Sequence, residues 1–144
     1  MWSDTLLAAE RTQLIRVLLW AATSATLGTA LVAIITLRRL VVPIVSAFAI
    51  QMLAWGSLEL ILAAVRWQGM AMRDVSSATR LDRMTWFGAG LDVGVIGAGV
   101  TALIVGWLSR RKLSVIGAGL GMVVQGLGLL VLDLTFASII ARLV

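Results

Sequence analysis

The sequence contains neither cysteine nor histidine among its 144 residues. This excludes disulfides, thiolate or imidazole metal sites, thiol nucleophiles and imidazole bases from its chemistry. Charged residues are also scarce, at 13% of the chain, and there is a single proline, Pro43, whereas 60% of the residues are hydrophobic. Such a composition lies far from that of a soluble globular domain and predicts an integral membrane protein.

The basic residues outnumber the acidic ones and give a net charge of +5. They stand at the ends of apolar runs and form no face with interleaved aromatic residues. This arrangement suits lipid headgroups and not a nucleic acid, so the bilayer is the expected partner.

Four apolar stretches are long enough to cross the hydrocarbon core, which takes about 20 helical residues. They cover residues 14–37, 41–67, 86–108 and 113–141. The breaks at 38–40 and 109–112 are so short that the helices of each pair must be antiparallel neighbours. The sequence therefore predicts an all-α transmembrane four-helix bundle, a single domain over 1–144 made of two tandem hairpins in a multi-pass protein.

Serines precede two of these spans. Ser3 is suited to cap a short helix before the first span, and Ser76 or Ser77 one before the third. Each short helix would continue into the span that follows it. The first and third helices are therefore expected to begin well outside the lipid.

The two halves of the chain resemble each other. With a shift of 72 positions, Glu10-Arg11 falls on Asp82-Arg83 and Arg38-Arg39 falls on Arg110-Arg111; two further residues bring Gln51 onto Gln125 and Glu59 onto Asp133. Membrane composition alone explains apolar coincidences but not these polar ones. We expect a repeat of residues 3–67 and 76–141, related by a pseudo-twofold axis along the membrane normal.

The orientation in the membrane is less constrained. Seven arginines lie on the side of the termini and central loop, against five basic residues in the two hairpin loops. This balance leaves both orientations open under the positive-inside rule, and we favour a cytoplasmic N-terminus.

Three carboxylates lie inside the spans. Counted along each span, Glu59, Asp92 and Asp133 are roughly 9 to 12 Å from its end and share the leaflet nearest the N-terminus. The same end of the bundle holds Arg16 and Arg83, whose side chains can reach inward, while Gln51 and Gln125 lie nearer mid-membrane. The acids predict either a proton or cation site, with Glu59 and Asp133 as pseudo-symmetric ligands, or a structural polar layer, or contacts with a partner protein.

The sequence VIGAG occurs at 95–99 and again at 115–119, and the first copy continues to Ala102 with the spacing of a dinucleotide-binding loop. A turn at mid-span would leave backbone groups unsatisfied in lipid, and no acid stands where a ribose needs one. No cofactor is therefore expected. The small-xxx-small pairs Gly90/Gly94 and Gly117/Gly121 instead predict that the third and fourth spans pack tightly, with each other or with another subunit.

The chain resembles small four-span bacterial membrane proteins of unknown function. The resemblance rests on its size, on the Gln51/Glu59 and Gln125/Asp133 pattern, and on Leu81-Asp82-Arg83 at the start of the third span. It implies a bacterial inner-membrane location and no particular activity. The chain is unlike the small multidrug transporters, because its first span carries Arg16 and no acid.

Two classes of function fit these features. The first is a non-catalytic accessory or scaffold subunit that binds other membrane proteins, or a second copy of itself, through glycine and tryptophan surfaces. The second is a small transporter or channel that uses the intramembrane carboxylates. An enzyme is not expected, because no nucleophile, base and metal are placed together.

Overall fold

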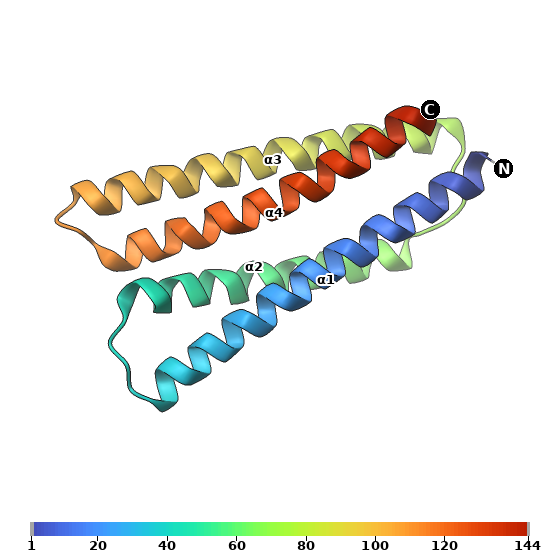
Figure 1. Ribbon diagram of the computed structural model, residues 1–144. Helices are drawn as coiled ribbons and strands as arrows, with labels where there is room; N and C mark the ends of the chain where they lie inside the picture. Colours follow the sequence, from blue (N-terminus) through green and yellow to red (C-terminus); the bar gives the residue numbers. More distant parts are fainter. Residues whose placement is uncertain (1, 144) are drawn as a thin grey trace.

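A computed structural model describes residues 2–143 and folds them into four α-helices with no strand among them. The helices are α1 (Trp2–Leu37), α2 (Pro43–Gln68), α3 (Val75–Leu108) and α4 (Leu113–Leu143). All four are long and apolar enough to cross a membrane. The predicted all-α membrane bundle of two tandem hairpins is confirmed (Figure 1).

Two of the helices are much longer than a bilayer requires. α1 has 36 residues and α3 has 34, so they measure roughly 54 and 51 Å, against about 30 Å of hydrocarbon. Both run without a break from outside their apolar spans, as expected. The helices therefore extend past the lipid at the end that holds the termini and the α2–α3 linker.

The predicted helix caps are wrong. α3 is capped by Asp74, whose carboxylate accepts the backbone N–H of Ser77 at 2.8 Å. Ser77 lies inside the first turn as a donor, because an acid three residues earlier already fills the cap position. α1 begins at Trp2, so Ser3 also lies inside a helix.

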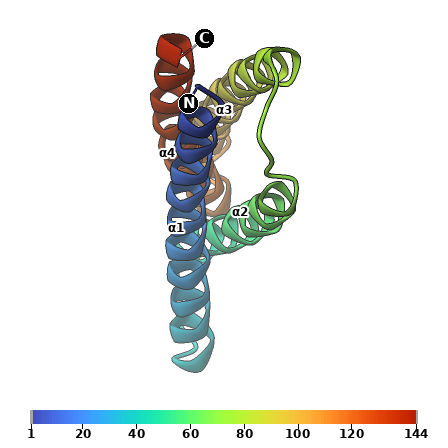
Figure 2. The same ribbon diagram turned by 90° about the vertical axis from the view of Figure 1, so that its right-hand side faces the viewer.

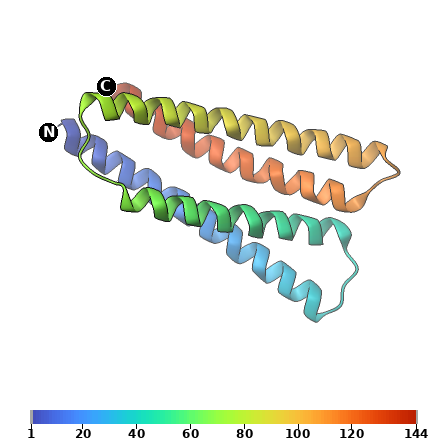
Figure 3. The ribbon, with the colours of Figure 1, turned by 180° about the vertical axis from the view of Figure 1, so that it is seen from behind.

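Both hairpin turns lie at the same end of the molecule, opposite the termini (Figure 3). They place Arg39, Arg110 and Arg111 in the left-handed region, with φ between 50° and 53°. Glycine would adopt this conformation without strain, whereas an arginine costs about 1 kcal/mol. The turns thus contain arginines although the backbone conformation is less favourable for them than for glycine. Positive side chains at this end of the molecule are suited to contact lipid headgroups.

The helices pack around α4. α1 pairs with α2 and α3 with α4, and α4 also contacts α2 and one end of α1, whereas α2 and α3 do not approach each other within residues 2–143. Figure 2 shows α2 and α3 splayed apart, with only the linker crossing between them. The main contact between the hairpins joins α2 and α4, the helices that the predicted repeat makes equivalent. The smaller contact departs from this symmetry, because α1 contacts α4 whereas α3 does not contact α2 within the described residues.

Glycines allow α4 to approach its three neighbours. A methyl group added at Gly119 would lie 2.7 Å from the carbonyl oxygen of Gly99 in α3. One added at Gly117 would overlap the backbone of Ile44 in α2, and one at Gly128 would overlap the indole of Trp20 in α1. Small residues that bring helix backbones together are the usual basis of packing in lipid.

The first hairpin uses glycine in the same way, and this gives a test of the packing. A methyl group at Gly56 would lie 2.5 Å from the backbone nitrogen of Ala25, whereas one at Gly97 would meet nothing within 4 Å. We expect Gly56→Ala to cost about 1–3 kcal/mol of stability through overpacking. Gly97→Ala should gain about 0.5–1 kcal/mol from the better helix propensity of alanine.

Thermal unfolding of the purified variants in detergent, followed by circular dichroism, measures both effects. Opposite shifts in Tm are expected. A similar shift in both variants would contradict the close approach of α1 and α2 at Gly56.

Candidate functional site

The three intramembrane carboxylates come together from three helices. Glu59 of α2, Asp92 of α3 and Asp133 of α4 lie close enough to act on one another electrostatically, and Arg66 is the cation that acts on all three. Asp133 lies against Gly88, where a methyl group would meet its Oδ2 at 2.5 Å. Glycine at this position therefore gives the carboxylate its space between α3 and α4.

A cavity of about 350 Å³ opens beside Asp133 at the linker end of the bundle. All four helices and the linker contribute to its wall. The polar lining residues are Glu10, Gln13, Arg66, Arg73, Thr85 and Asp133, and the apolar ones include Leu14, Val17, Ala63, Leu81, Met84 and Phe136. The cavity thus joins a polar side to an apolar side, which is the usual composition of a small-molecule pocket.

Two buried polar side-chain atoms lack hydrogen-bond partners among the described residues, and one of them belongs to a residue of the cavity wall. Gln13 is only 7% exposed; its Nε2 donates to Oδ1 of Asp133 at 3.5 Å, while its Oε1 is buried and unpartnered. Asp92 is 8% exposed, and its Oδ2 is likewise without a partner. Both atoms are acceptors, so the region has a surplus of acceptors over donors.

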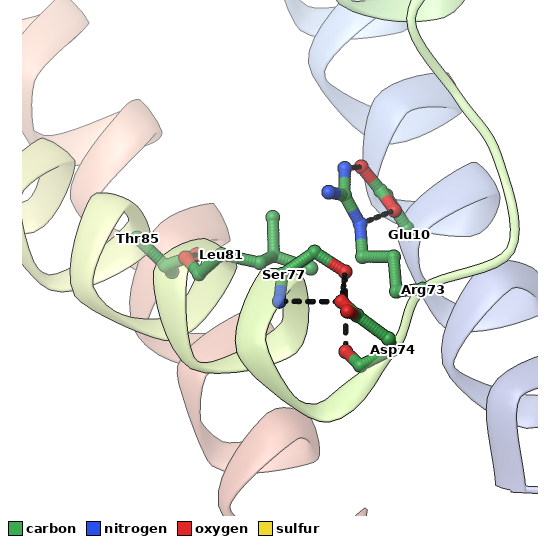
Figure 4. Close-up of polar contacts among 6 residues, drawn as sticks. All are labelled: Glu10, Arg73, Asp74, Ser77, Leu81 and Thr85. Carbon is green, nitrogen blue, oxygen red and sulfur yellow. Dashed lines mark hydrogen bonds and ion pairs between the residues drawn. The ribbon is translucent and has the colours of Figure 1, made fainter.

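An ion pair fastens the linker to α1 beside the cavity (Figure 4). Nε of Arg73 donates to one carboxylate oxygen of the buried Glu10 at 2.8 Å, and Nη2 donates to the other. This bidentate contact raises the pKa of Arg73 above its ordinary value. Next to it, the Ser77 hydroxyl and backbone N–H and the Ser76 hydroxyl hold the pKa of Asp74 below its usual range.

Nearer mid-membrane, Gln125 joins three helices. It is 0% exposed; its Oε1 accepts the indole N–H of Trp20 at 2.8 Å, and its Nε2 lies 3.5 Å from the sulfur of Met52. Gln51, its counterpart in the predicted repeat, instead packs its aliphatic stem against Gly121. The two glutamines therefore make different contacts.

The remaining residues of the predicted site lie apart from the cavity. Arg16 and Arg83 are exposed, and Arg16 borders a groove between α1 and α4. The predicted packing glycines also divide into two groups. Gly117 and Gly121 face α2, whereas Gly90 and Gly94 face open space.

Sequence reasoning missed Gln13 and the pairing of Glu10 with Arg73. The buried residues of α1 include Leu6, Glu10, Gln13 and Val17, which recur at the three- and four-residue spacing of a helix face. A polar residue within an apolar stripe of that period is the signal that identifies Gln13. No comparable pattern identifies Arg73, because its position depends on the path of the linker.

The Gln125 contacts predict a specific coupling. Gln125→Leu should cost about 1–3 kcal/mol, because the Trp20 N–H then loses its acceptor in the bundle interior. Trp20→Phe added to Gln125→Leu should cost less than the sum of the two single changes. Gln51→Leu is the matched control and should have a smaller effect.

Unfolding free energies in detergent complete this double-mutant cycle. Strictly additive costs for Trp20→Phe and Gln125→Leu would refute the coupling.

Comparison with known proteins identifies a family. A family model described as a family of unknown function matches residues 16–134, which include the four helices for most of their length. No curated protein matches the sequence, and no solved structure matches it.

Proposed function

We propose that this chain, which belongs to the DUF6992 family of unknown function, is a non-catalytic accessory subunit of a larger membrane protein assembly. The observation that supports this proposal is a stripe of open glycines on α3, formed by Gly90, Gly94 and Gly97. The stripe is the surface at which a transmembrane helix of the partner packs.

The stripe is exceptional within this protein. At every helical glycine except these three, an added Cβ atom would lie within 4 Å of another helix. Elsewhere in these helices, glycine therefore occurs where a neighbouring helix packs closely. The three glycines on one face of α3 have no such neighbour in this chain, so we infer that a helix of another protein packs there. The spacing of four and then three residues keeps them in line along α3.

The position of the stripe also favours an external partner. Gly99 follows Gly90 by nine residues, which is about half a turn beyond two full turns of helix, and it packs on α4. The stripe therefore faces away from α4, the only helix whose backbone α3 approaches within residues 2–143. In lipid, where apolar area alone gives no drive to associate, such small residues are what allow two helices to bind.

Purification from native membranes tests this proposal. In mild detergent, the tagged chain should recover larger membrane proteins at fixed stoichiometry, measured by quantitative mass spectrometry. Gly94→Leu should abolish this recovery, because its side chain holds the partner backbone away. Val65→Leu, which adds bulk to an exposed position on α2, is the control and should leave recovery unchanged.

Two results would argue against the accessory role. One is a stable homo-oligomer with no other chain attached. The other is full recovery of the partner by the Gly94→Leu variant.

A second candidate, proton- or cation-coupled transport, is favoured by the cavity beside Asp133. Under this candidate, purified protein in liposomes should carry protons or cations down an imposed gradient, followed with a pH-sensitive dye. Glu59→Gln and Asp133→Asn should lose the flux. Asp82→Asn should retain it, because Asp82 neither lines the cavity nor acts on the three carboxylates. Absence of flux under proton and cation gradients would contradict transport.

A further inference from the structure

We propose that the cavity beside Asp133 is a binding site for a small organic ammonium ion with an apolar body. This site is distinct from the glycine stripe of α3 and does not depend on the accessory role. It would also supply the substrate class of the second candidate function.

The hydrogen-bonding groups of the cavity favour a ligand that donates hydrogen bonds. Oε1 of Gln13 is buried, unpartnered and part of the cavity wall. Turning the amide over would set this oxygen against the Asp133 carboxylate, so the contact of Nε2 with Asp133 fixes its orientation. An ammonium group offers three donors and no acceptor, and can bond to Asp133 and Gln13 together.

Thr85 adds to the acceptors. Its hydroxyl donates to the backbone oxygen of Leu81 at 2.9 Å, which leaves the lone pairs of the hydroxyl oxygen free to accept.

The charges of the region favour a cation over an anion. Arg73 is neutralised by its bidentate contact with Glu10. Arg66 is then the remaining cation in the cavity wall, and it acts on three carboxylates, Glu59, Asp92 and Asp133. Asp133 is the member of this group that lines the cavity. An ammonium group bound beside it would stabilise its ionised form, because opposite charges attract strongly in a low dielectric.

The walls of the cavity favour an organic cation over a bare metal ion. No group of three or more acidic residues is placed to hold a metal among residues 2–143. Much of the wall is aliphatic or aromatic, with Val17, Leu81 and Phe136 among the lining residues. An apolar body therefore has a surface to pack on, and the volume of about 350 Å³ falls within the range of small-molecule pockets.

Phenethylammonium is a suitable probe, with 2-phenylethanol as its neutral analogue and phenylacetate as its anionic one. Isothermal titration calorimetry on the full chain in detergent should show saturable binding of phenethylammonium at one site per chain, and no binding of either analogue. Asp133→Asn should weaken binding at least about tenfold through loss of a charge-assisted hydrogen bond. Asp82→Asn, the same change away from the cavity, should bind as the natural sequence does.

Gln13→Leu separates a binding role from a structural one. It removes the unpartnered Oε1 together with the long Nε2 contact to Asp133. These two effects on stability oppose each other, so the variant should fold with a Tm close to that of the natural sequence, yet bind phenethylammonium several-fold more weakly. Equal binding of phenethylammonium by the natural sequence, Asp133→Asn and Gln13→Leu would overturn the proposal. So would binding of 2-phenylethanol as tight as that of the amine, or tighter binding of phenylacetate. Because Gly94→Leu leaves the cavity intact, failure of the partner experiment would not affect this one.

Discussion

Close backbone contact at the glycines of α4 is the constraint on which the rest of this structure depends. In a bilayer, apolar side chains gain little by leaving lipid for another helix, so association depends on contact area and on bonds between helices. α4 obtains this contact on three sides, because its glycines face α2, α3 and α1 in turn. The hairpins are held together by the contacts of α4 with α2 and, to a smaller extent, with α1.

A single central helix has a geometric consequence. α2 and α3 each pack on α4 but from different sides, so they do not meet within the described residues. α1 contacts α4 from Leu6 near its N-terminus to Trp20 near its middle. The opening this leaves at the linker end is where Asp133 and Gln13 lie and where Arg73 and Glu10 fasten the linker. The surplus of acceptors there follows from how the helices are arranged and not from any one local motif.

Much of this fold follows from the sequence, because a bilayer forces apolar runs of sufficient length into helices. The shared depth of Glu59, Asp92 and Asp133 also follows, because it depends only on chain direction and helical rise. The contacts between particular side chains, in contrast, do not follow from the sequence. The contact of Gln125 with Trp20 and Met52, and of Asp133 with Gln13, depends on the rotation of each helix about its axis. Packing between distant segments sets that rotation, so the alignment of Gln51 with Gln125 in the predicted repeat does not say which side chains each of them contacts.

The two VIGAG segments show how one short pattern can carry different packing. Glycines two positions apart lie about 200° apart around a helix, so each segment presents two nearly opposite faces. Gly99 of the first copy and Gly119 of the second meet each other across the α3–α4 contact. On the other face of α4, Gly117 of the second copy packs against α2. The equivalent glycine of the first copy, Gly97, faces open space. The motif that resembles a nucleotide-binding loop thus provides two faces on which other helices can pack. In α4 a neighbouring helix covers both faces, whereas in α3 a neighbouring helix covers only the face of Gly99.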